Sequence, residues 1–232
     1  MKQQASKTLT RHSLFATVLL LAGGNAMSLE KPEYTVVYKE GDVEYRQYEP
    51  YLVAETVISN SDNYKDAGNE GFRRLFRYIT GNNSSSSEVA MTAPVQQTPQ
   101  SEKIAMTAPV QSSESASGWT VAFMLPTKYT LDSAPVPLDE RIQVRRVPGR
   151  TMAVIRYSGR WTESNYAKRS KQLMKTLEKK DVTAISEFES ALYNAPYVPP
   201  FMRRNEVMVQ VDVLPAEARI ASTESGSQQA AW

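Results

Sequence analysis

Three runs of apolar, β-branched and aromatic residues open the folded part of the chain. They are YTVVYK (34–39), VEYRQY (43–48) and YLVAETVI (51–58), and such residues favour extended backbone. Glu40-Gly41-Asp42 lies between the first two runs and is typical of a turn. The pattern therefore predicts three consecutive strands.

The pattern then changes to a helical period. Phe72, Leu75, Phe76 and Ile79 recur at i, i+3, i+4 and i+7, which places them on one face of a helix. Ser, Asn and Asp residues at 59–62 are candidate N-caps, and Gly and Asn residues at 81–83 end the helix. We predict a helix that ends at about Ile79.

The same order of patterns returns after a proline-rich connector at 133–139. A strand at 119–126 closes the first half, and the second half is predicted to hold strands at 140–147 and 151–159, a helix at 162–179, and strands at 190–196 and 205–214. Ala54 and Ala153 hold corresponding places, 99 residues apart. The sequence therefore predicts an α+β domain of two ββαββ halves, about 32–126 and 140–214, whose antiparallel sheets join and whose helices pack outside.

The hexapeptide AMTAPV occurs twice, at 90–95 and 105–110. Its proline cannot donate to a β-ladder, so a strand ends or lies at a sheet edge there. We predict either two short strands flanking a turn at 96–102, or one strand at 105–110 preceded by a copy that is not a strand. The serine-rich segment 112–118 is predicted to be a loop.

The two ends of the chain have patterns of their own. Residues 1–26 combine a basic start, the apolar run LFATVLLLAGG and a small residue at Ala26, which indicates a secretory signal peptide. The run is too short to span a bilayer, which needs about 20 apolar residues. We therefore expect an exported protein, periplasmic or secreted, without a membrane anchor. Residues 215–232 show no periodicity and are predicted to be a flexible tail.

Composition restricts the chemistry. The chain has no Cys, and its one His, His12, lies within the predicted signal. This excludes Ser-His-Asp triads, cysteine nucleophiles and His/Cys metal sites from the folded domain. No glycine-rich phosphate-binding motif is present. The charges nearly balance, so we expect no nucleic-acid partner. Among the carboxylates, Glu55, Glu70 and Glu206 stay candidates for acid–base chemistry, although none lies in a motif.

Four segments together resemble the SOUL haem-binding protein family in its bacterial exported form. They are KIAMTAPV (103–110), WTVAFMLPTKYTL (119–131), MAVIRYSGRW (152–161) and YNAPYVPPFMRRNEVMVQV (193–211). The resemblance covers roughly residues 32–214 and implies a twisted β-barrel of two ββαββ halves. It also implies that the protein binds haem or a related tetrapyrrole for buffering or transport, with haem as a ligand and not as a catalytic cofactor.

The resemblance further implies a hydrophobic cleft beside the first helix, with basic residues near the haem propionates. The candidate haem-binding residues are Phe72, Arg73, Phe76, Arg77, Tyr78, Tyr193 and Met202. The apolar helix positions also suit a plain core stripe, and the arginines also suit a solvated face. A related fold, that of gyrase-inhibitor-like domains, leaves a second interpretation: an effector-binding module or a small-molecule hydrolase. A third is a stress-related structural protein without a physiological ligand.

Overall fold

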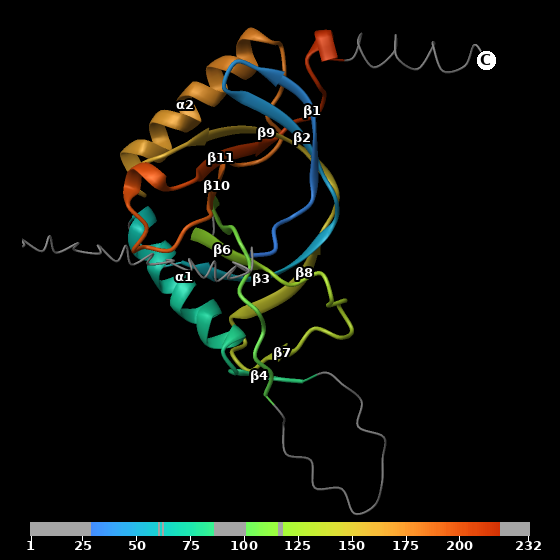
Figure 1. Cartoon of the computed structure of the whole chain (residues 1–232), viewed down its shortest axis with the longest axis vertical. Helices are drawn as coiled ribbons and strands as arrows, with labels where there is room; N and C mark the ends of the chain where they lie inside the picture. Colours follow the sequence, from blue (N-terminus) through green and yellow to red (C-terminus); the bar gives the residue numbers. More distant parts are fainter. Residues whose placement is uncertain (1–28, 60, 62, 86–100, 116–117, 219–232) are drawn as a thin grey trace, which may run out of the picture.

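A nine-stranded antiparallel sheet, strongly curled into a half-barrel, forms the body of the protein (Figure 1). The computed structural model describes residues 29–59, 61, 63–85, 101–115 and 118–218. The predicted signal peptide and the first AMTAPV copy lie outside these residues.

Most of the elements predicted from the sequence are confirmed. The first half contains β1 (Tyr34–Glu40), β2 (Val43–Tyr48), β3 (Tyr51–Ile58), α1 (Tyr64–Ile79), β4 (Asn83–Ser84), β5 (Val110–Ser115) and β6 (Gly118–Met124). The second half contains β7 (Val136–Pro137), β8 (Ile142–Val147), β9 (Arg150–Tyr157), α2 (Glu163–Lys179), β10 (Glu189–Leu192), the 3-10 turn η1 (Pro200–Met202) and β11 (Asn205–Gln210).

The strand order of the large sheet is β1-β2-β9-β11-β10-β5-β6-β3-β8. Without the edge strand β1 this order is symmetric about the central β10–β5 pair. The register repeats as well, because Ala54 pairs with Val144 on one side and Ala153 pairs with Tyr45 on the other, each residue being displaced by 99 positions. Each half therefore contributes one strand, β2 or β8, to the other half's part of the sheet.

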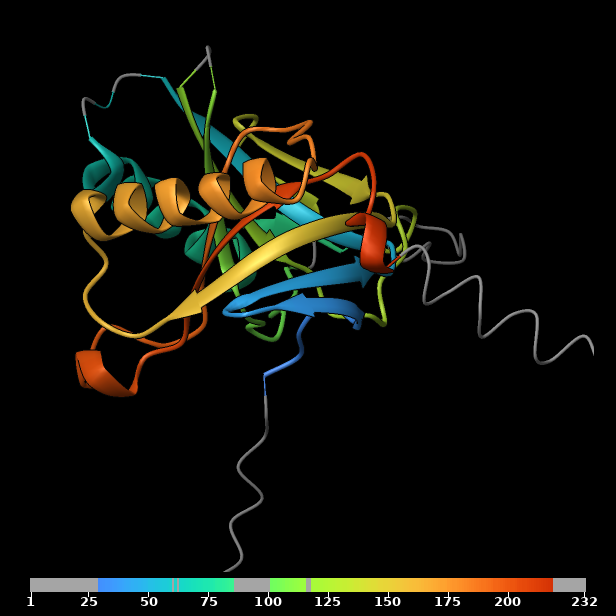
Figure 2. The same cartoon turned by 90° about the horizontal axis from the view of Figure 1, so that it is seen from above.

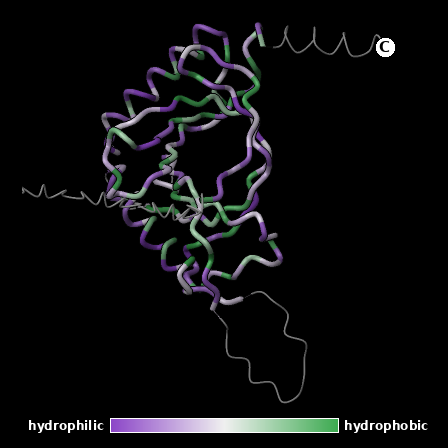
Figure 3. The backbone as a smooth tube through the Cα atoms, viewed as in Figure 1, coloured by the Kyte–Doolittle hydropathy of each residue, from purple (hydrophilic) through white to green (hydrophobic). Residues whose placement is uncertain are grey.

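The helices cover the outer face of the sheet, α1 over β3 and β6 and α2 over β9 and β11 (Figure 2). Central strands such as β9 and β11 are buried on both faces, so one set of their side chains meets the helices and the other lines the inner face. Figure 3 shows hydrophobic stretches along the strands and a mostly hydrophilic α2. Val121 and Phe123 pack in the cluster under α1, whereas Val53 and Ala122 pack in a separate inner cluster.

Both helices begin at a residue that caps them. The side chain of Asn63 accepts a hydrogen bond from the Asp66 N–H at 2.9 Å, and that of Thr162 accepts one from the Asn165 N–H at 3.2 Å. The caps are also 99 positions apart, so the symmetry extends to the helices.

The prediction of a strand at 105–110 is wrong, as is that of a loop at 112–118. The backbone at residues 104 and 108, just before and within the second AMTAPV copy, bonds outside the large sheet: the Ile104 N–H donates to the Ile79 carbonyl and the Ala108 N–H to the Glu30 carbonyl. The strand begins only at Val110 and continues through the serines, because β6 and β10 bind this segment on both sides. Small serine side chains suit that central position, where the Ser112 and Ser190 hydroxyls bond at 2.8 Å.

Two connecting segments are more ordered than the sequence predicts. The proline-rich connector contributes β7, which pairs with β4 in a small separate sheet. The start of the predicted tail packs on the domain, since Ala218 is buried and Glu217 bonds to Lys180 at 2.9 Å. Within the described residues, no helix is long and apolar enough to cross a membrane.

Candidate functional site

The outer face of α1 carries a stacked pair of aromatic rings. The ring centroids of Phe72 and Phe76 lie 5.8 Å apart with an interplanar angle of 13°. Phe72 is half-buried and meets the Phe123 ring edge-on at 5.3 Å, whereas Phe76 is 42% exposed. Of the predicted apolar face, Leu75 and Ile79 are therefore part of the core. Phe72 and Phe76 form an apolar ridge of which Phe76 is exposed.

Two guanidinium groups stand beside this ridge. Arg73 is exposed and donates to the Glu70 carboxylate at 3.0 Å, which holds the pKa of Glu70 below its usual value. Arg77 is also exposed and forms no ion pair with any described residue. Arg74 is different: it is buried and donates to the Thr56 hydroxyl at 2.7 Å, so it serves the packing of α1 on β3.

Tyr78 does not belong to the exposed face. It is fully buried, and its hydroxyl donates to the Pro135 carbonyl at 2.7 Å. Burial raises the pKa of this phenol, so the protonated donor form is favoured. These contacts do not suit an iron ligand at the surface, and we remove Tyr78 from the candidate site.

The symmetry-related helix α2 has no aromatic ridge. The positions 99 residues after Phe72 and Phe76 are Lys171 and Lys175, and both are exposed. The two helices therefore share a fold and a capping pattern but differ in the chemistry that they present. Only α1 combines a stacked aromatic pair with nearby arginines at these positions.

Tyr193 lies in another place, a buried polar cluster on the inner face of the second half. Its hydroxyl donates to Glu206 at 2.9 Å. Arg46 donates to both Glu206 oxygens, at 2.9 and 3.1 Å, and Arg204 donates to the same carboxylate at 2.8 Å. Tyr48 accepts from Arg46 at 3.1 Å. We call these five residues the Glu206 cluster.

The Glu206 cluster is closed to ligands. Glu206 and Arg46 are almost completely buried, and each is saturated by its neighbours. Burial alone would lower the pKa of Arg46, but its hydrogen bonds to Glu206 raise it. From the sequence, Glu206 is only a possible acid–base residue, because charged residues in a strand usually face solvent. Nothing in the local pattern indicates a buried partner 160 positions away.

Met202 lies at the tip of the loop between β10 and β11, and is 64% exposed. Arg203 fixes this loop, since its guanidinium donates to the carbonyls of Val198 at 2.7 Å and Pro196 at 2.6 Å. Figure 2 shows that this loop lies away from α1. The structure thus divides the sequence candidates among the α1 face, the core, the Glu206 cluster and the loop.

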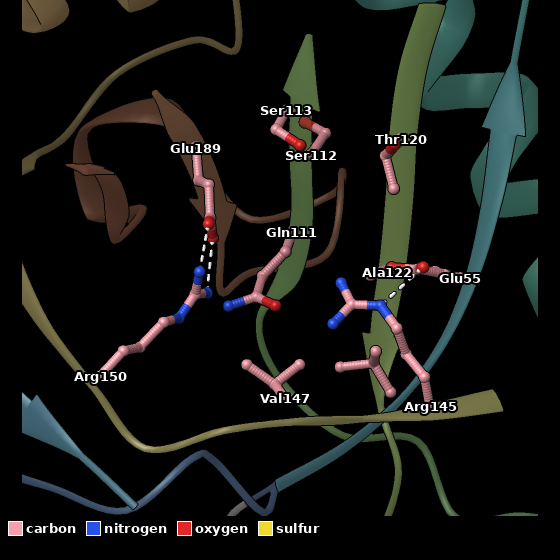
Figure 4. Close-up of a pocket in the computed structure, with 11 residues that line it drawn as sticks. Glu55, Gln111, Ser112, Ser113, Thr120, Ala122, Arg145, Val147, Arg150 and Glu189 are labelled. Carbon is pink, nitrogen blue, oxygen red and sulfur yellow. Dashed lines mark hydrogen bonds and ion pairs between the residues drawn. The ribbon is translucent and has the colours of Figure 1, made fainter. Parts of the chain in front are cut away.

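A small pocket with a cavity volume of about 40 Å³, open to solvent, lies on the inner face of the first half (Figure 4). Its floor is apolar and is formed by Val53, Ala122 and Val147. Its walls include two ion pairs, Arg145–Glu55 at 2.7 Å and Arg150–Glu189 at 2.6 Å. The small volume and polar walls suit a small polar molecule better than a broad apolar macrocycle. Among the described residues, no group of acidic or histidine side chains could hold a metal ion.

The chain matches the sequence profile described as SOUL heme-binding protein over residues 29–210. It is 28% identical over 164 residues to heme-binding protein 1 of Xenopus laevis, which covers 71% of this chain and 80% of that protein. It is 25% identical over 142 residues to heme-binding protein 1 of Mus musculus, which covers 61% of this chain and 70% of that protein. Among solved structures, the C-terminal domain of EcmrR shares the fold, with a TM-score of 0.52 at 9% identity over 78% of this chain and 99% of that one.

Proposed function

Because the chain belongs to the SOUL heme-binding protein family, we propose that it binds haem or a related tetrapyrrole on the outer face of α1. The macrocycle rests on the ridge formed by Phe72 and Phe76. The propionates meet the guanidinium groups of Arg77 and Arg73. The observation that supports this position is the stacked pair of half-buried Phe72 and exposed Phe76, which α2 lacks.

The residues of this face suit a macrocycle with acidic side groups. Covering the exposed part of Phe76 with an apolar ring system contributes about 1 kcal/mol. Guanidinium forks bind carboxylates well, and Arg77 is available without breaking an ion pair among the described residues. Arg73 would have to leave or share Glu70, so we assign it the smaller contribution.

We assign no protein ligand to the iron. The chain has no Cys, and its one His lies in the predicted signal peptide, so the usual strong axial ligands are missing from the domain. Binding then depends on the ring system and the propionates. This suits a carrier or buffer, and the signal-like residues 1–26 support such a role outside the cytoplasm.

We also propose a binding protein and not an enzyme. Glu55, Glu70 and Glu206 each accept a hydrogen bond from an arginine. None of them can take a proton from a substrate without disturbing an ion pair. No contact of these carboxylates favours the hydrolase alternative.

The central experiment is a pair of titrations of the protein, one with hemin and one with iron-free protoporphyrin. We expect both to saturate near one ligand per chain, followed by the Soret band and by porphyrin fluorescence. The affinities should be similar, because the iron contributes little. Non-saturating uptake of both ligands would contradict the proposal, and saturation by hemin alone would show that an iron ligand is needed.

Arg77→Glu tests the location of the site. The substitution replaces a propionate partner by a repelling charge, so we expect about tenfold weaker binding, or about 1.4 kcal/mol. Lys175→Glu is the matched control, because it makes the same charge change at an exposed position of α2. Equal effects of the two variants would indicate a general charge effect and remove Arg77 from the site.

A further inference from the structure

The inner-face pocket occupies the place that the Glu206 cluster fills in the other half. Arg145 corresponds to Arg46 by the displacement of 99 positions, and β3 and β9 hold β6 and β11 in equivalent registers. Thr120 consequently stands where Glu206 stands in the second half. Val147 likewise corresponds to Tyr48.

These replacements remove both volume and charge. A threonine takes the place of a glutamate and a valine that of a tyrosine, and the space they leave is the pocket, which Thr120, Arg145 and Val147 all line. Glu44, the other carboxylate bound to Arg46, is replaced by Gln143. In the second half's interior, Arg46 therefore binds two carboxylates. In the first half's interior, Arg145 binds only one.

The Arg145 guanidinium is only partly used. Its Nε donates to Glu55 Oε1 at 2.7 Å, and its two Nη groups make no hydrogen bond to the described residues. Figure 4 shows the Nη groups directed at the space between Gln111 and Thr120. Two parallel N–H groups of a guanidinium match the two oxygens of a carboxylate.

The pocket walls also contain buried polar atoms without a hydrogen-bond partner among the described residues. These atoms are Glu55 Oε2 and Arg150 Nε. Buried polar atoms are nearly always paired in folded proteins, so such atoms beside a pocket call for an explanation. Glu55 lines the pocket, so a small rotation of its side chain brings this oxygen to a ligand that also carries a donor.

We propose that the pocket binds a small carboxylate with a hydroxyl or ammonium group on the neighbouring carbon. Its carboxylate lies at the place that corresponds to the Glu206 side chain in the second half. It accepts hydrogen bonds from the Nη groups of Arg145. Its donor group meets Glu55. The two arginines and two glutamates of the walls balance in charge, which accommodates an amino acid as well as a hydroxy acid. This site is separate from the α1 face and does not depend on haem binding.

Titrations with glycolate, glycine, acetate and methylammonium, followed by backbone amide NMR, test the proposal and identify the donor. We expect saturable shifts in β5, β6 and β8 with glycolate or glycine, and at least tenfold weaker binding of acetate, which lacks the donor. Methylammonium should cause no saturable shift. If none of the carboxylates saturates, the pocket holds solvent only and the proposal is overturned.

Two variants examine the proposed contacts. Arg145→Gln should abolish saturable binding, while Arg146→Gln, on the opposite face of the same strand, should leave it unchanged. Thr120→Glu supplies the missing carboxylate from the protein, so it should also block binding in a folded chain. Binding that survives either Arg145→Gln or Thr120→Glu contradicts the assigned position. Hemin titrations of both variants should match the original protein, which distinguishes this site from the α1 face.

Discussion

Arg46 and Arg145 show how strongly the surroundings decide what a residue does. Both lie on the inner face at equivalent positions, yet Arg46 is 2% exposed at its side chain and Arg145 is 49% exposed. Arg46 is held by three oxygen-bearing neighbours and contributes to the fold. Arg145 has one such neighbour and is available for recognition.

Glu206→Ala should strongly destabilise the protein. The substitution leaves the buried Arg46 without its main partner and frees Arg204, and breaking a buried pair from one side costs about 3–5 kcal/mol. Urea denaturation followed by circular dichroism measures the loss. The double variant Arg46→Met/Glu206→Leu should recover part of it, because no charge is then left buried. A loss below about 1 kcal/mol in the single variant would mean that water reaches the cluster.

At the scale of elements, the periodicity of apolar residues is enough to predict both helices and most strands. It failed at β5, because the pairing of a strand depends on its neighbours in the sheet and not only on its own composition. Serines 112 and 113 look like a loop, yet they lie between β6 and β10, where the ladder fixes them. The reverse holds for residues 105–109, whose β-like pattern cannot reveal that their backbone groups bond to other segments.

The contact between α1 and β6 depends on the absence of a side chain at Gly71. A Cβ at this position would overlap the Val121 side chain, whereas a Cβ at Gly68, one turn earlier, would meet nothing within 4 Å. Gly71→Ala should therefore destabilise the protein by about 1–3 kcal/mol through overpacking. Gly68→Ala should stabilise it by up to about 1 kcal/mol, because alanine favours the helix. Thermal unfolding should show shifts of opposite sign, and a rise for both variants would contradict the close packing.

The candidate site could be predicted from the sequence only in part. The helical period identifies the face that contains Phe72 and Phe76, but it cannot show which of the two rings stays exposed. Tyr78 directly follows Arg77, yet in a helix one step turns the side chain about 100° away, and this places it in the core. Tyr193 and Met202 are neighbours in a motif and still belong to different surroundings, because the β10–β11 loop carries one inward and the other out to solvent.

At the scale of the whole molecule, buried tyrosines make the fold sensitive to high pH. Burial raises the pKa of Tyr45 to about 12 and raises the pKa of Tyr48, Tyr78, Tyr157, Tyr166 and Tyr193 as well. The folded state then holds these protons more tightly than the unfolded state. The stability that these protonated phenols contribute is fully present below the ordinary tyrosine pKa of 10.0. It is lost as the pH rises through the pKa values of the tyrosines in the folded state.

We therefore expect the alkaline titration to be cooperative. Phenolate absorbance should rise steeply above pH 10, together with the loss of near-ultraviolet circular dichroism. Tyr157→Phe should retain the fold and reduce the amplitude of the late phase. A gradual titration that is complete without unfolding would show that these phenols are accessible to solvent.

The repeat of 99 positions could be found in the sequence, since Ala54 and Ala153 already indicate it. The exchange of β2 and β8 between the halves could not, because both possible pairings bury the same residues and the local pattern does not distinguish them.

That exchange has an implication for the origin of the molecule. Because β2 pairs with β9 and β8 pairs with β3, a polypeptide consisting of one half alone would lack a strand that only a second copy could donate. Two such copies would interlock as a strand-swapped homodimer with a twofold axis at the central pair, a common route by which identical subunits associate. Gene duplication and fusion through a connector such as 133–139 would then yield the present single chain. In the single chain the two interiors differ, because one is filled by the Glu206 cluster and the other is an open pocket.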